Sequence, residues 1–228
     1  VTVEQMREMT EAYFGGFGRG PEVSDYPPIP EIPRRDGERR AVIDDPLAQL
    51  PLVYMAYNVP PGDHPDRFAL NVLSNILSDG ESSRLHRKLL KEEKVAPTVF
   101  SGFNLRRGPG MFVFGSLPNQ GIEVGRIEEL IDREIARVKE EGVTEREVAK
   151  AVNNLRASQV TSRLTVNGKA NAIQSAILFF GDPYQVNRDL DEYREVTPEA
   201  VRRVAREYLI TENRTVIIAQ PVQSGADR

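Results

Sequence analysis

The 228-residue sequence contains no cysteine and only two histidines, His64 and His86. The absence of cysteine excludes disulfides, thiolate zinc sites, iron–sulfur clusters and cysteine nucleophiles. No apolar run approaches the ~18 residues that a membrane-spanning helix needs, so we expect no membrane span. The 30 basic and 34 acidic residues nearly balance, for a net charge of −4, which argues against a general nucleic-acid-binding surface.

The shortage of histidine also bears on metal binding. A zinc site needs about three protein ligands, and paired histidines usually lie close together on one helix face. His64 and His86 are 22 residues apart, and neither H-x-x-E-H nor H-E-x-x-H occurs in the sequence. We therefore expect His64 to cap a helix end and His86 to lie on the surface. We assign no metal ligand and no catalytic residue to this chain.

Composition and periodicity divide the chain into four regions. Residues 1–17 predict a helix, with Thr2 as its N-cap, Gln5 three residues later, and glycines at its end. Residues 18–39 are rich in proline and glycine and have neither helical nor strand periodicity, which predicts a linker. Residues 40–221 form the compact part, and residues 222–228 are expected to be a loose tail.

Within the compact part, strands and helices occur in separate runs, which favours an α+β fold over a doubly wound parallel sheet. The strand over 52–59 is apolar on both faces, so we expect it to be central. Thr144 and Glu147 form a capping box at the start of one helix. The predicted strands are 40–44, 51–59, 95–106, 110–118 and 214–219, and the predicted helices are 64–78, 82–93, 122–141, 144–162, 167–180 and one opening at Thr197-Pro198.

One short motif offers a candidate site. Ser82, Ser83 and Arg84 follow a glycine turn and open a predicted helix. A helix start with serine and arginine can hold a substrate carboxylate. Capping serines and an ion-paired arginine explain the same three residues more simply. We keep Ser82, Ser83 and Arg84 as candidate substrate-binding residues.

The order of motifs over about 40–221 resembles the pitrilysin/insulinase-type zinc metallopeptidase family. The most specific pieces are the L-x-x-x-L-S-D-G-x-S-S-R-L block at 73–85 and the closing V-T-x-E-x-V…Y-L…N-R-T-V-I-I stretch. The resemblance implies two homologous halves, each an antiparallel sheet backed by helices on one face. It places H-x-x-E-H and a later glutamate in the amino-terminal half only.

This chain resembles the carboxy-terminal, non-zinc half, with residues 1–17 resembling the last helix of a preceding half. We therefore expect the sequence to be a piece of a longer protein. In many such halves an arginine and a tyrosine after the S-R-L block assist the substrate carbonyl. Leu90 and Pro97 stand at those two positions here, and neither can donate a side-chain hydrogen bond.

The resemblance implies a half that encloses and orients a peptide or unfolded-protein substrate and is inactive alone. Its partner would be the amino-terminal zinc-binding half, which would hold the zinc and hydrolyse the peptide bond. Two alternatives stay open: a non-catalytic scaffold or assembly subunit of the same family, and a peptide-binding module in which a strand such as 110–118 accepts an extended peptide. Relatives with fused halves are often bacterial and exported, which favours the bacterial periplasm.

Overall fold

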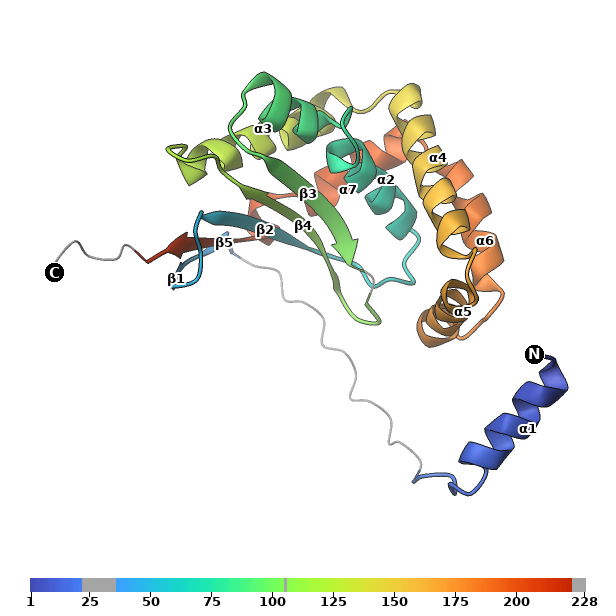
Figure 1. Ribbon diagram of the computed structural model, residues 1–228. Coiled ribbons are helices and arrows are strands. Elements are labelled where there is room, and N and C mark those ends of the chain that lie inside the picture. Colours follow the sequence, from blue (N-terminus) through green and yellow to red (C-terminus); the bar gives the residue numbers. More distant parts are fainter. Residues whose placement is uncertain (22–35, 105, 223–228) are drawn as a thin grey trace, which may run out of the picture. The chain divides into compact units, whose positions relative to one another are not determined.

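The computed structural model describes residues 1–21, 36–104 and 106–222 (Figure 1). The chain divides into two compact units, Val1–Glu31 and Ile32–Arg228. Most of the predicted linker 18–39 and of the predicted tail 222–228 lies outside the described residues. None of the described helices is long and apolar enough to cross a membrane.

The first unit contains one described helix, α1 (Val3–Phe14). The Thr2 hydroxyl accepts a hydrogen bond from the Gln5 amide at 3.2 Å, and the Gln5 side chain accepts one from the Thr2 amide at 2.9 Å. This reciprocal pair confirms the predicted capping box. No residue of α1 is buried, so its apolar side chains, such as Tyr13 and Phe14, are exposed.

The second unit is built on a five-stranded sheet in the order β1-β5-β2-β4-β3. The strands are β1 (Arg39–Asp45), β2 (Leu52–Val59), β3 (Thr98–Asn104), β4 (Gly110–Leu117) and β5 (Arg214–Pro221). The central position of β2 and the β3–β4 hairpin are confirmed. The expected antiparallel sheet is confirmed for three of the four strand pairs, whereas β1 and β5 pair in parallel. This parallel pair arises because β5 inserts between β1 and β2.

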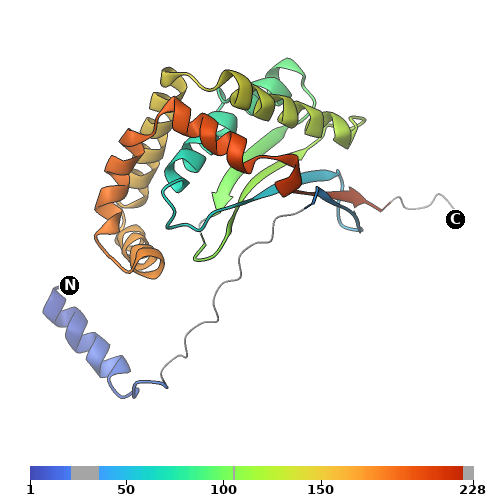
Figure 2. The same ribbon diagram turned by 180° about the vertical axis from the view of Figure 1, so that it is seen from behind.

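Helices cover one face of this sheet. Figures 1 and 2 show α2 (Arg67–Ser78), α3 (Val124–Glu141) and α7 (Pro198–Tyr208) on that face, as the resemblance implied. The chain also forms α4 (Glu145–Ser162), α5 (Val166–Phe180), α6 (Gln185–Glu192), and the short turns η2 (Tyr193–Glu195) and η3 (Thr211–Asn213). Sequence patterns did not predict α6, whose N-cap residue, Tyr184, makes no side-chain capping bond.

Alternation along β2 shows which face is the core. Val53, Met55, Tyr57 and Val59 are buried, whereas the residues between them are only partly buried. The predicted apolar character of both faces is therefore real, but described helices cover one face only. We call the other side the open face, and its central residues, identified by strand alternation and register, are Tyr54, Ala56, Phe100, Val113, Gly115 and Ile217.

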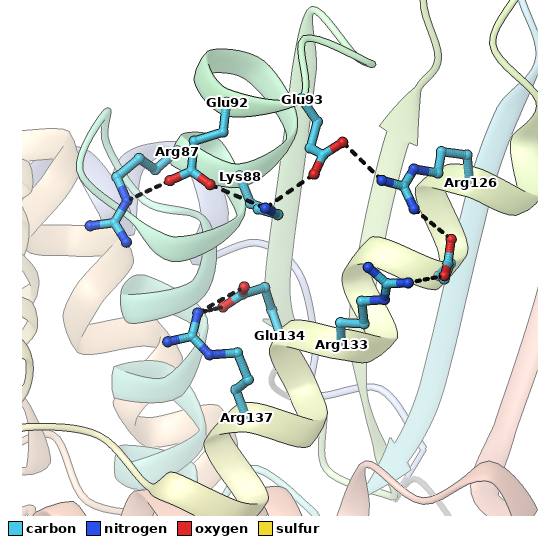
Figure 3. Close-up of polar contacts among 9 residues, drawn as sticks. Arg87, Lys88, Glu92, Glu93, Arg126, Arg133, Glu134 and Arg137 are labelled. Carbon is cyan, nitrogen blue, oxygen red and sulfur yellow. Dashed lines mark hydrogen bonds and ion pairs between the residues drawn. The ribbon is translucent and has the colours of Figure 1, made fainter.

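The predicted helix 82–93 differs in kind from the expectation. It is a π-helix, η1 (His86–Glu92), in which the Glu93 amide donates to the Lys88 carbonyl at 3.0 Å. Figure 3 shows Glu93 between Lys88 (3.1 Å) and Arg126 of α3 (2.8 Å). Solvent screens exposed ion pairs of this kind, so they contribute little to stability. The fully buried Leu89 is therefore the main anchor of η1 to the core.

A second ionic cluster holds the sheet edge to α3. Arg214, at the start of β5, donates to both carboxylate oxygens of Asp132 at 2.6 and 2.8 Å. It also pairs with Glu38, just before β1, and lies 3.5 Å from Glu128. The Arg214 side chain is only 10% exposed, so these acids compensate a charge that is largely withdrawn from water.

Candidate functional site

The candidate residues Ser82, Ser83 and Arg84 lie in the loop between α2 and η1. Gly80 turns this loop with a positive φ of 75°, a conformation that glycine adopts without steric cost. The Ser83 hydroxyl is buried and donates to the Gly80 carbonyl at 2.7 Å. Ser82 is exposed and hydrogen-bonds to Lys150 of α4. Ser83 directly precedes the helical residues Arg84 and Leu85, and its carbonyl accepts from the Arg87 amide at 3.0 Å, whereas η1 itself has no side-chain capping bond.

Arg84 joins the loop to the start of α4. Its Nε and Nη2 atoms donate to the two carboxylate oxygens of Glu147 at 2.7 and 2.9 Å, and Nη2 also donates to the Gly142 carbonyl at 3.1 Å. A bidentate arginine–carboxylate pair is both strong and directional. The structure thus shows the ion-paired arginine that the simpler interpretation of the sequence expected.

Glu147 also closes the predicted capping box of α4, because it accepts from the Thr144 amide at 2.8 Å. Burial raises the pKa of Glu147, but the hydrogen bonds from Arg84 and from the Thr144 backbone lower it more, to about 2. The ordinary value is 4.5. The carboxylate is therefore charged throughout the neutral and mildly acidic range.

This shift leads to a prediction for Glu147→Gln. Because the folded pKa lies below the unfolded one, Glu147 stabilises the fold fully above pH 4.5 and loses that contribution as the pH falls toward 2. We expect the variant to lose about 2 kcal/mol of unfolding free energy at pH 7. Urea unfolding across pH should show the difference shrinking with acid. An equal loss at pH 7 and pH 3 would contradict the assignment.

A cavity of about 290 Å³ lies directly beside this loop. Ser82 and Ser83 contribute to its lining, together with the cationic side chains of Arg87, Arg146 and Lys150. Glu147 also lines it, but its charge is balanced by Arg84. The surplus of positive charge makes the cavity suited to a carboxylate.

Sequence reasoning did not find the three cations of this cavity. Arg146 and Lys150 stand four residues apart on α4, a spacing that places both on one helix face. Arg87 comes from η1 and reaches the cavity from another segment. The spacing of the first two was visible in the sequence, but their approach to Ser82 depends on how α4 packs beside the α2–η1 loop.

Leu90 and Pro97 stand at the positions where the resemblance implies an arginine and a tyrosine, and neither side chain has a polar group. Leu90 is half-buried in η1 and packs against the core. Pro97 is exposed just before β3. Both positions therefore supply apolar surface.

The two histidines do not share a site-forming cluster. The His64 Nδ1 atom accepts from the Asp66 amide at 3.2 Å, but the N-cap of α2 is Asp66 and has no side-chain capping bond, so the structure does not bear out the expectation that His64 caps this helix. His86 is half-buried rather than on the surface, and its Nδ1 atom has no hydrogen-bond partner within the described ranges. Among the residues that the structure describes, no group of three or more histidine, cysteine, aspartate or glutamate side chains could hold a metal ion.

The open face carries an aromatic pair. The rings of Tyr54 on β2 and Phe100 on β3 lie 6.4 Å apart, and Gly115 of β4 is paired with both residues. A Cβ atom on Gly115 would lie 2.1 Å from the Phe100 ring, so only glycine permits this arrangement. Phe100 remains 45% exposed, and Tyr54, Ala56 and Ile217 are partly exposed, whereas Val113 and Gly115 are buried.

The hairpin does not offer β4 as an acceptor for a peptide strand. β4 lies between β2 and β3 and pairs with both, so the strand-addition interpretation of 110–118 is wrong for this strand. Only β3 of the hairpin is an edge strand. Its Ser101 amide already donates to the Ser78 hydroxyl of α2 at 2.7 Å.

The second unit is thus a five-stranded sheet with helices on one side and an open face on the other. Residues 1–155 match the family model described as the Peptidase M16 inactive domain. The chain belongs to this family of peptidases, as an inactive domain, which confirms the resemblance drawn from its motifs.

Individual relatives agree with this assignment. The chain is 24% identical over 221 residues to the zinc protease PqqE of Helicobacter pylori, covering 97% of this chain and 50% of that protein. It is 32% identical over 145 residues to an uncharacterized zinc protease of Streptomyces coelicolor, covering 63% of this chain and 31% of that protein. The crystal structure of a protease from Helicobacter pylori superposes with a TM-score of 0.87 at 24% identity, over 97% of this chain and 53% of that one. The chain thus spans about half the length, or less, of the curated relatives that it matches.

Proposed function

We propose that this chain is the carboxy-terminal, non-metal half of a zinc metallopeptidase and that its open face forms one wall of a substrate chamber. The observation that supports this most is the apolar open face itself, which no described helix of the second unit covers. Contiguous exposed apolar surface marks a place where another protein surface or a ligand binds. The occupants that we propose are the amino-terminal zinc half and the peptide between the two halves.

The described residues of this chain do not fit a zinc site, because His64 lies in the loop before α2, His86 lies in η1, and no carboxylate cluster joins them. Metal-assisted hydrolysis would therefore belong to the other half. This chain would hold the peptide in place and exclude water around it. The apolar Leu90 and Pro97 suit a wall of that kind better than a hydrogen-bonding role.

The cavity beside Ser82 refines this proposal. Ser82 would contact a carboxylate of the peptide together with Arg87, Arg146 and Lys150. Ser83 and Arg84 would act as positioning residues, because their polar groups bond to Gly80 and Glu147 within the protein. Ser82, Ser83 and Arg84 thus keep a proposed part in substrate binding, but only Ser82 would touch substrate.

Reconstitution with the separately produced amino-terminal half tests this function. We expect neither piece alone to cleave an unstructured fluorogenic peptide and their mixture to cleave it. Phe100→Asp on the open face should lower the reconstituted rate at least about tenfold, because a charge there disfavours apolar docking. The matched control is Val160→Asp, which changes a 53% exposed residue on α4.

Two outcomes would contradict the proposal. One is cleavage or stoichiometric zinc binding by this chain alone. The other is a Phe100→Asp variant that folds normally and reconstitutes at full rate.

The second candidate is a non-catalytic scaffold subunit of the same family. It is favoured by the apolar residues at positions 90 and 97, which offer no help to a substrate carbonyl. The two candidates differ in the reconstitution: a scaffold pair would bind peptide without hydrolysing it. The bacterial periplasm stays a proposed location, to be tested by cell fractionation.

A further inference from the structure

The outer edge of β1 is available for another strand. β5 pairs with one side of β1, and no strand pairs with the other side in the described part of the chain. Every residue of β1 is at least partly exposed, with Val42 57% and Ile43 50% exposed. A row of backbone groups on such an edge, flanked by apolar side chains, is a template for pairing with a further strand.

The sequence of β1, Arg-Arg-Ala-Val-Ile-Asp-Asp, has opposite charges at its two ends. If two copies pair antiparallel around Val42, Arg39 faces Asp45 of the second copy and Arg40 faces its Asp44. Opposite charges directly across two antiparallel strands stabilise the pair, and like charges destabilise it. The strand is therefore complementary to itself in this one register.

In the same register, paired residues also lie on the same face of the sheet. Alternate residues of β1 point to opposite faces of the sheet. One face has Arg40, Val42 and Asp44, and it is the helix-covered one, because Arg40 bonds to Glu128 of α3. The other face has Arg39, Ala41, Ile43 and Asp45. Pairing around Val42 joins residues 39 with 45, 40 with 44 and 41 with 43. The two numbers in each pair differ by an even number, so both residues lie on the same face. The helices of both copies would then lie on the same side of one continuous sheet.

We propose that the β1 edge is a homodimer interface, in which β1 of a second copy adds antiparallel about a two-fold axis at Val42. This is an isologous contact, the commonest kind in soluble homodimers. A seven-residue strand buries little surface, so the dimer should be weak and depend on concentration. Leu47, 89% exposed in the loop after β1, adds apolar area beside the edge.

The Arg39–Asp45 pair is the best place for a test. Arg40 is unsuitable because it also bonds to Glu38 and Glu128 and so helps to hold β1 in place. Arg39 and Asp45 are both at the ends of β1 and at least partly exposed. Asp45 also accepts from the Leu47 amide at 2.9 Å, so Arg39→Asp is the cleaner of the two single variants.

Sedimentation velocity over a concentration series would measure self-association of the full chain. Arg39→Asp and Asp45→Arg, each alone, should weaken it about tenfold, because two attractive cross-strand pairs become repulsive. An equimolar mixture of the two variants should regain the association of the original chain, since it again opposes aspartate to arginine at both ends. The double variant should regain it as well.

Lys169→Asp on α5 is the matched control, because it changes the net charge equally at another exposed position and should leave association unchanged. Circular dichroism and melting temperature would verify that every variant folds. A chain that stays monomeric at all concentrations would overturn the proposal. So would a dimer that is indifferent to Arg39→Asp, or a mixture of the two variants that fails to associate.

Discussion

Replacing Arg214 by leucine is expected to lower the free energy of unfolding by about 3–5 kcal/mol. The substitution leaves Glu38, Glu128 and Asp132 close together without the guanidinium that balances them. The first two side chains are only 19% and 12% exposed, so water screens their repulsion poorly. Chemical denaturation at pH 7 measures the loss.

The pH dependence of this variant distinguishes charge from packing. In the original protein burial raises the pKa of Glu38, but Arg214 and Arg40 lower it overall, so its stabilising contribution fades as acid protonates it. In Arg214→Leu the clustered carboxylates repel one another, so their protonation stabilises the variant. The difference in the free energy of unfolding between the original protein and the variant should therefore become smaller below about pH 5. Arg133→Leu, which removes a 59% exposed partner of Glu129, should lower the free energy of unfolding far less than Arg214→Leu does.

Phe112→Ala on β4 is expected to cost about 3–5 kcal/mol. Phe112 is fully buried on the helix-covered face, with its ring centroid 5.2 Å from that of Phe114. Truncating it leaves a cavity that the surrounding helices and strands can fill only in part.

Phe100→Ala is the matched comparison, because the same truncation falls on the open face of the neighbouring strand, where Phe100 is 45% exposed. We expect a loss of about 1 kcal/mol or less, since much of its surface already contacts water. Equal losses at the two positions in thermal or urea unfolding would contradict the assignment of core and open face.

The sequence by itself determined the features that depend on near neighbours. The capping boxes Thr2–Gln5 and Thr144–Glu147 need residues three apart, and both are present as predicted. The β3–β4 hairpin joins neighbouring strands, and its turn residues were legible in the same way. The absence of cysteine and of a paired-histidine motif limited the metal chemistry before any fold was known.

Only the tertiary structure decided which distant segments meet. β5 comes from the end of the chain and inserts between β1 and β2, which creates the parallel pair and leaves β1 at the edge. Arg84 finds Glu147 sixty-three positions away, and the cations of the cavity come from two separate elements. The local sequence shows whether a residue is apolar or charged. Whether its face is covered, paired or open follows from long-range packing, because burial depends on neighbours that are distant in sequence.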